Sequence, residues 1–255
     1  VRRADDADRS AALLRLYRRR DDFHHPVDRS RRLKVRGRYA SPHSVTMADK
    51  AVRNILETQR SYPPHDFGKE IDWSHNPTRD NEWLWQLHRM YSWNHLARAY
   101  WRSGDEKYAS AWARQLLHWI EHNPLDEDHR YAWRTIEAGI RGHSWVGLFQ
   151  HFLDSPKFTP DVLVAFMKSC HEHAAYLHAS LGRKPGGGNW RLMEAEGLAH
   201  IAICFPQFRQ ADAWRRRAFK VLTSQIARQV RDDGMHFEQC FNYHSGCIHW
   251  FARTA

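Results

Sequence analysis

Apolar side chains recur at steps of three and four residues along most of the chain from residue 81 onward, the spacing of one helix face. The first such run begins at Asn81 and includes Trp83, Leu87, Met90, Tyr91, Ala97 and Trp101. We predict that this run is one continuous helix ending at Gly104, a residue that suits a helix stop. Asp105 is positioned to cap the next helix, which we expect over residues 106–122.

The same period and similar end signals predict helices along the rest of the chain. They cover residues 11–20, 45–59, 131–153, 161–181, 192–205, 211–230 and 243–255. Short breakers rich in Pro, Gly, Asp and Asn separate them, and no convincing alternating strand interrupts them. The pattern therefore predicts an all-α protein of antiparallel helix pairs. The last helix carries no stop signal, so we expect the chain to be a fragment.

The chain of 255 residues carries a formal net charge of +10, with 39 Lys and Arg against 29 Asp and Glu. Such an excess favours a polyanionic partner: nucleic acid, acidic lipid or acidic polysaccharide. No run of about 18 apolar residues is present, so we expect no membrane span. Most of the 12 tryptophans are expected in the core, and the remainder offer indole faces that stack on sugar rings.

Three glycines precede Asn189 in the stretch "PGGGNWRLMEAEG", residues 185–197. One interpretation is that the backbone must pass close to a ligand while Asn189 is presented from the start of a helix. The alternative is a plain glycine-rich connection with a capping Asn.

Metal binding is not expected from the sequence. The four cysteines are scattered, and the spacing of Cys240, His244, Cys247 and His249 matches none of the common zinc patterns. We therefore predict no metal site, no cofactor and no disulfide framework.

Several phrases, taken in order, are distinctive. They are "EIDWSHNP", "NEWLWQLHRMYSW", "AYWRSGDEKYASAW", "WIEHNPL", "YAWRTIEAGIR", "GGGNWRLMEAEGL", "FPQFRQADAW" and "QVRDDGMHFEQCFNYHSG". Together these phrases, which span residues 70–250, resemble the helical domain of heparinase II/III-type polysaccharide lyases, most closely the heparinase III branch.

The resemblance implies an incomplete α/α toroid, which we place over residues 46–255 with its C-terminal end truncated. The composition of residues 1–45 predicts an Arg-rich arm with a helix, packed on this domain or, alternatively, solvated. In the family a C-terminal antiparallel β-sandwich domain follows, which this chain lacks, and without it activity is expected to be weak or absent. The resemblance also implies a periplasmic or secreted protein that cleaves a uronic-acid polysaccharide, such as heparin or heparan sulfate, by metal-free β-elimination.

The resemblance assigns the chemistry to an Asn and a Tyr. Elimination requires removal of the C5 proton beside a carboxylate, and a donor aimed at that carboxylate stabilises the charge that develops. Asn189 matches the family's neutralising Asn, and Tyr243 matches its base. A free phenol has a pKa of about 10, so neighbouring positive charge must lower it for work near neutral pH.

Other residues complete the predicted site. His244 either assists Tyr243 catalytically or is simply a histidine at a helix start. Arg134 and Arg141 lie seven residues apart on one helix face and suit carboxylate or sulfate groups. The alternative for both is an ion pair with Glu137.

The remaining candidates are for substrate binding: Trp190, Glu196, Gln86 and His88, with Arg89 beside them. Trp190 stands where some relatives have a His after the neutralising Asn, and it offers a stacking surface instead. Glu196 is on the same helical side as Asn189, where it either orients Asn189 or pairs with an arginine.

Three other functions remain open. A toroid hydrolase would need paired carboxylates, for which Glu194, Glu196 and Glu238 are the candidates, but it leaves the Asn and Tyr motifs unexplained. A non-catalytic module for heparin-like polyanions would use the net charge alone. An alginate-type polyuronate lyase would share the chemistry. The sequence has no nucleic-acid-binding signature, so a nucleic-acid partner is not expected.

Overall fold

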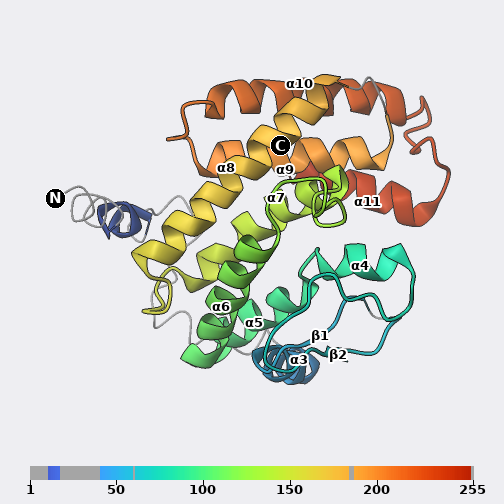
Figure 1. Cartoon of the computed structure of the whole chain (residues 1–255). Coiled ribbons are helices and arrows are strands. Elements are labelled where there is room, and N and C mark those ends of the chain that lie inside the picture. Colours follow the sequence, from blue (N-terminus) through green and yellow to red (C-terminus); the bar gives the residue numbers. More distant parts are fainter. Residues whose placement is uncertain (1–10, 18–40, 60, 184–186, 254–255) are drawn as a thin grey trace. The chain divides into compact units, whose positions relative to one another are not determined.

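The computed structural model describes residues 11–17, 41–59, 61–183 and 187–253. The chain divides into two compact units. Unit 1 comprises residues 1–131 and 147–167, and unit 2 comprises residues 132–146 and 168–255. The predicted all-α fold class is confirmed, because helices dominate both units (Figure 1). No helix in the described parts combines the length and the apolar character that crossing a bilayer requires.

Unit 1 contains a group of packed helices and one short hairpin. Its elements are α3 (Pro42–Val52), β1 (Ile55–Leu56), β2 (His65–Asp66), α4 (Asn81–Leu87), α5 (Tyr91–Ser103), α6 (Glu106–His122) and the 3-10 helix η1 (Gln150–Phe152). Helix α3 packs against α5 and α6, which also pack against each other (Figure 1). Trp112 anchors this core, stacked on Phe152 with ring centroids 4.5 Å apart and buried with Trp93.

Two predicted helices of unit 1 are wrong in extent. The helix expected over residues 45–59 ends at Val52, and Asn54 turns the chain with a φ of 61° into β1, which pairs antiparallel with β2. The run from Asn81 is two helices, because Met90 adopts a left-handed φ of 57° between α4 and α5. The apolar period continues through the break, so the pattern alone does not reveal it.

The helix predicted over residues 106–122 is confirmed in its bounds as α6. Gly104 ends α5 with a φ of 70°, and the Asp105 side chain accepts a hydrogen bond of 3.0 Å from the Lys107 backbone N–H. Both signals are local and therefore readable from sequence.

The predicted arm over residues 1–45 lies mostly outside the described residues. Residues 11–17 are helical, as predicted for that part of the segment 11–20. Leu14 and Tyr17 are buried, and the Tyr17 ring meets Phe149 edge-on at 6.1 Å within unit 1.

Unit 2 consists of helical segments. Its elements are the first part of α7 (Thr135–Phe149), the later part of α8 (Pro160–Arg183), and α9 (Asn189–Cys204), α10 (Ala211–Gln229) and α11 (Phe241–Ala252). Helix α9 packs against both α10 and α11 (Figure 1).

Helices α7 and α9 touch backbone to backbone at glycines. A Cβ added to Gly139 would lie 2.5 Å from the carbonyl oxygen of Met193, and one added to Gly142 would lie 2.9 Å from that of Gly197. A Cβ on Gly197 would likewise collide with the Gly139 carbonyl. Only glycine permits this approach. It explains the glycines of "IEAGIRGH" and "EAEGLAH" and fixes α9 against α7.

Candidate functional site

Asn189 is the first residue of α9, so this helix begins three residues before the one predicted from Leu192, and the interpretation that Asn189 stands at a helix start is correct. Gly188 precedes Asn189 with a backbone φ of 100°, a conformation that residues other than glycine rarely adopt. The Gly188 carbonyl accepts a hydrogen bond of 3.1 Å from the Arg191 N–H. Asn189 is half-buried and Trp190 is 47% exposed. The start of α9 is therefore partly accessible to solvent.

A chain of hydrogen bonds joins this segment to the start of α11. Gln229, the last residue of α10, donates from Nε2 to the Gly188 carbonyl at 3.1 Å. Its Oε1 lies 2.8 Å from Nε2 of His236, and the His236 backbone N–H donates to Nδ1 of His244 at 3.3 Å. Gln229 and His236 are both almost fully buried. The segments carrying Asn189 and Tyr243 are thus held through a shared, buried polar network.

The network also fixes histidine tautomers. Because Oε1 of Gln229 faces Nε2 of His236, that nitrogen carries the proton, and burial lowers the pKa of His236, which favours the neutral ring. Nδ1 of His244 accepts a hydrogen bond, so a neutral His244 carries its proton on Nε2.

Tyr243 lies in the first turn of α11, with 42% of its surface exposed, directly before the half-buried His244. Tyr243 is therefore accessible to solvent. Neither Asn189 nor Tyr243 is enclosed in the apolar interior, which is the first requirement for both to reach a saccharide.

Arg134 and Trp190 lie together although 56 positions separate them in sequence. The Arg134 guanidinium carbon lies 4.8 Å from the centroid of the Trp190 ring. Arg134 also makes a two-pronged ion pair with buried Glu137, at 2.5 Å from Nε and 2.7 Å from Nη2. The structural alternative for Arg134 is therefore present, and it holds the guanidinium against an exposed indole face.

Arg141 is completely buried. Its Nε donates to Nε2 of His173 at 2.8 Å, and its guanidinium lies over the rings of Trp133 and Trp145. Burial lowers its pKa to about 9. These contacts favour a structural role over the predicted contact with substrate, and they include a hydrogen bond to His173, a residue that the sequence did not suggest.

Glu196 is 2% exposed, and its Oε1 lies 2.9 Å from Nε of Arg253. Burial outweighs the attraction of Arg253 and raises the pKa of Glu196 to about 7. The alternative that Glu196 pairs with an arginine is the arrangement observed.

Gln86 and His88 belong to unit 1 and are buried there. Gln86 bonds to Glu82, and His88 Nδ1 accepts a hydrogen bond of 3.1 Å from the Trp119 indole N–H. Their described contacts are those of core polar groups. Arg89, beside them, lies 3.8 Å from Glu82.

The sequence reasoning missed Gln229 and His236. The signal for them was weak: both lie in the phrase "QVRDDGMHFEQCFNYHSG", on either side of the "DDG" turn. That turn brings them together, since Val230 and His236 form an isolated antiparallel bridge.

Two groups of side chains in the described ranges have ligand atoms close enough to share a metal ion, all within 4.8 Å of one another. They are His43, Glu57 and His95 in unit 1, and His143, Glu196 and His200 in unit 2. The set of Cys240, His244, Cys247 and His249 is not such a group; Cys240 is exposed whereas Cys247 is buried.

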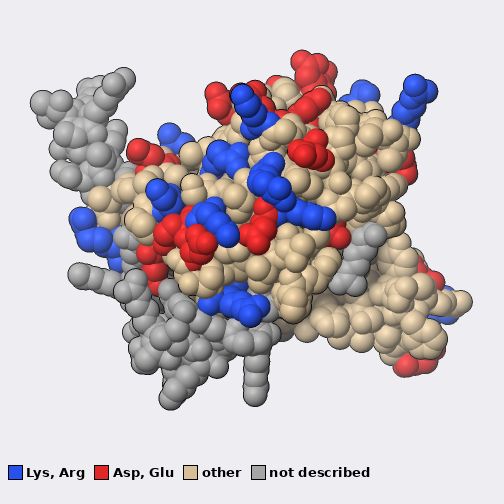
Figure 2. Space-filling model, turned by 90° about the horizontal axis from the view of Figure 1, so that it is seen from below, with Lys and Arg blue, Asp and Glu red and all other residues tan. Residues whose placement is uncertain are grey.

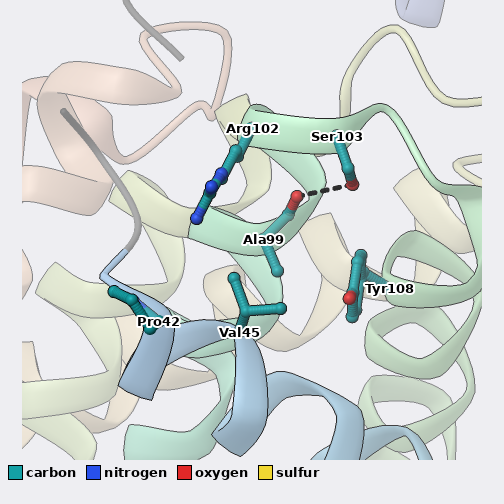
Figure 3. Close-up of a pocket in the computed structure, with 6 residues that line it drawn as sticks. All are labelled: Pro42, Val45, Ala99, Arg102, Ser103 and Tyr108. Atoms are coloured by element: carbon teal, nitrogen blue, oxygen red, sulfur yellow. Dashed lines mark hydrogen bonds between the residues drawn. The ribbon is translucent and has the colours of Figure 1, made fainter. Parts of the chain in front are cut away.

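A pocket of about 330 Å³ opens in unit 1 between α3, α5 and α6 (Figure 3). It is lined by Pro42, Val45, Ala99, Arg102, Ser103 and Tyr108, none of them a predicted site residue. On the face shown in Figure 2, Lys and Arg side chains are interspersed with Asp and Glu rather than gathered in one basic patch.

Comparison with known proteins identifies close relatives. The chain is 34% identical over 269 residues to a heparin-sulfate lyase of Bacteroides stercoris, covering 98% of this chain and 39% of the relative. It is 37% identical over 211 residues to a heparin-sulfate lyase of Pedobacter heparinus, covering 82% of this chain and 32% of the relative. The chain thus spans well under half the length of these relatives.

Solved structures agree. The crystal structure of heparan sulfate lyase HepC from Pedobacter heparinus matches 97% of this chain and 39% of its own, with a TM-score of 0.82 and 35% identity. The sequence pattern of the family described as Heparinase II/III N-terminus matches residues 1–255. The chain therefore belongs to the heparinase II/III family and corresponds to its N-terminal helical part.

Proposed function

We propose that this chain carries the binding and proton-transfer groups of a lyase that cleaves a heparin- or heparan-sulfate-like polysaccharide by β-elimination. The observation that carries the proposal is the buried hydrogen-bond chain from Gly188 through Gln229 and His236 to His244. Gly188 directly precedes Asn189, and His244 directly follows Tyr243. The hydrogen-bond chain therefore connects the two segments whose side chains the chemistry needs.

Asn189 acts on the substrate carboxylate. Its amide N–H donates to a carboxylate oxygen of the uronate, and the bond strengthens as negative charge builds up there during loss of the C5 proton. Its place at the first turn of α9 adds the partial positive charge of a helix N-terminus.

Tyr243 acts as the base. Its phenolate oxygen removes the C5 proton, the electron pair of that C–H bond forms the C4–C5 double bond, and the bond from C4 to the glycosidic oxygen breaks. The departing oxygen takes up a proton, for which the phenol just formed is one donor. His244 is adjacent to Tyr243 and its ring is oriented through the His236 N–H.

Trp190 and Arg134 supply a binding surface beside Asn189. The indole face stacks on a sugar ring, and the neighbouring guanidinium attracts sulfate or carboxylate groups. Arg134 already pairs with Glu137, so it contributes to the electrostatic potential at this surface rather than forming a new two-pronged bond to the substrate.

The hydrolase alternative is disfavoured by burial. Glu194 and Glu196 are almost fully buried and lie close to Arg191 and Arg253, respectively, whereas Glu238 is exposed. A hydrolase needs two carboxyl groups flanking one bond in the open.

The test uses a form of the protein extended to the length of its relatives, incubated with heparan sulfate, heparin and alginate. Ultraviolet absorbance of unsaturated uronate products is the readout. We expect turnover on the sulfated glycans, and its loss in Tyr243→Phe with glycan binding retained.

Saturated products would establish a hydrolase, and salt-sensitive retention without product would establish a binding module. Product from alginate alone would reassign the substrate. Turnover that survives in Tyr243→Phe would remove Tyr243 from the role of base.

A further inference from the structure

Three side chains of unit 2 converge where α7 crosses α9. His143 comes from α7, and Glu196 and His200 come from α9, one helical turn apart. One ligand atom of each lies within 4.8 Å of the other two, and Nε2 of His143 is 4.0 Å from Oε1 of Glu196. The glycine contact between the two helices brings these side chains together.

Each of the two imidazole rings has one nitrogen with a free lone pair, as a metal ligand requires. Nδ1 of His200 lies 2.9 Å from the backbone carbonyl of Glu196 and must donate to it, which leaves Nε2 with a lone pair. Nε2 of His143 faces a donor, Nη1 of Arg253, at 3.2 Å, so it too presents a lone pair. A backbone carbonyl that fixes the tautomer of a ligating histidine is a common feature of metal sites.

A positive group already fills the space. Arg253 reaches Oε1 of Glu196 at 2.9 Å through Nε and reaches His143 through Nη1. The side chain of Arg253 is 39% exposed, whereas that of Glu196 is 3% exposed, so the arginine can withdraw into water and leave the acceptors in place. The cluster thus attracts a cation and holds one that is replaceable.

Zinc fits the donor set. Zn²⁺ binds imidazole nitrogen and carboxylate oxygen at about 2.0–2.2 Å, so its ligand atoms lie roughly 3.4 Å apart in a tetrahedral site. The three ligand atoms lie within 4.8 Å of one another, so binding requires each pair to close by at most about 1.4 Å. Two imidazoles and one carboxylate leave the fourth position for water.

We propose that His143, Glu196 and His200 form a Zn²⁺ site that ties α7 to α9, and that zinc displaces Arg253 from Glu196. The sequence did not indicate this site, because its ligands come from two segments 53 positions apart. The other group, around Glu57, is a weaker candidate, since His43 is exposed and both ring nitrogens of His95 already face partners, Ser44 and Glu57.

The test is calorimetric titration of the 255-residue chain with ZnCl₂ after treatment with a chelator. We expect one zinc per chain at this site, with affinity lowered more than about tenfold in His143→Ala and in His200→Ala. Glu196→Gln, which keeps the volume of the side chain, should weaken binding similarly. Arg253→Met should strengthen binding, because it removes the competing cation.

His249→Ala is the matched control: it removes an exposed histidine of the same unit and should leave the affinity unchanged. Circular dichroism establishes that each variant is folded, and Co²⁺ in place of zinc gives a visible absorption that reports its ligands. Absence of binding, or binding unaltered in the His143, Glu196 and His200 variants, overturns the proposal; loss confined to a His95→Ala variant places the ion in unit 1 instead and also overturns it.

Discussion

The side-chain amide of Gln229 donates a hydrogen bond of 3.1 Å to the backbone carbonyl of Gly188, the residue directly before Asn189. The end of α10 thereby holds the first turn of α9. Gln229 is 1% exposed, and its amide also faces Gln225 and His236, so one buried side chain serves three partners.

Gln229→Leu should destabilise the protein by about 2–3 kcal/mol, because leucine of similar size leaves buried polar groups without a partner. In an active, extended form, we also expect lower turnover, since the segments carrying Asn189 and Tyr243 lose their link. Urea unfolding measures the first effect. Gln210→Leu, at an exposed position, is the control and should change stability by less than about 0.5 kcal/mol. Equal effects of the two substitutions would show that the network contributes nothing.

Gly139→Ala should cost about 2–3 kcal/mol or more, because its new methyl group would lie 2.5 Å from the backbone oxygen of Met193 and a backbone cannot yield cheaply. Gly147→Ala, in the same helix α7, is the matched control. A Cβ there meets nothing within 4 Å, so alanine should stabilise by up to about 1 kcal/mol. The two unfolding midpoints should therefore move in opposite directions. A neutral Gly139→Ala would contradict the close helix contact.

The stability of the protein should depend on pH through Glu196 and His143. Burial raises the pKa of Glu196 from 4.5 to about 7, so between these values the folded state keeps a proton that the unfolded chain has released. Its contribution to stability therefore declines as the pH rises through that window. Burial lowers the pKa of His143 from 6.5 to about 3, and its contribution rises with pH between those values.

The two groups oppose each other between about pH 4.5 and 6.5, so the wild-type chain should be nearly insensitive to them there. Glu196→Gln removes one of the pair. At about 1.4 kcal/mol for each pH unit, the variant should gain about 3 kcal/mol over the wild type as the pH rises from 4.5 to 7. His200 and Arg253 also face Glu196 and are unchanged in both proteins. Denaturant unfolding across this range is the measurement, and a constant difference would contradict the raised pKa.

Trp190→Ala should weaken binding of heparan sulfate oligosaccharides about 5- to 30-fold, the loss expected when one exposed stacking surface is removed. Stability should hardly change, because the indole is 47% exposed. Ile203→Ala removes a similarly exposed apolar side chain from the far end of α9 and should leave binding intact. Fluorescence or calorimetric titration distinguishes the two variants, and undiminished affinity in Trp190→Ala would exclude stacking at this residue.

Local signals determined much of the fold. The start of α6 follows from Gly104 and Asp105, and the glycines before Asn189 marked a helix start there as one of two interpretations. Each of these features depends on a few neighbouring residues, so the sequence contains them directly. The resemblance to the family was also readable from the sequence, because each quoted phrase is one unbroken stretch of residues.

Tertiary structure decided the rest. The apolar period runs unbroken through Met90, yet the chain turns there, and nothing in the pattern of residues 131–153 shows that Arg141 is buried on His173 while Arg134 stays beside an indole. Burial and partnership depend on which helices meet, and at what distance, between segments far apart in sequence. His143 meets Glu196, and Gln229 meets Gly188, only once α7, α9 and α10 have packed together. The reason is that the distance between two helix backbones, and not the neighbouring residues in sequence, determines which side chains touch across a helix interface.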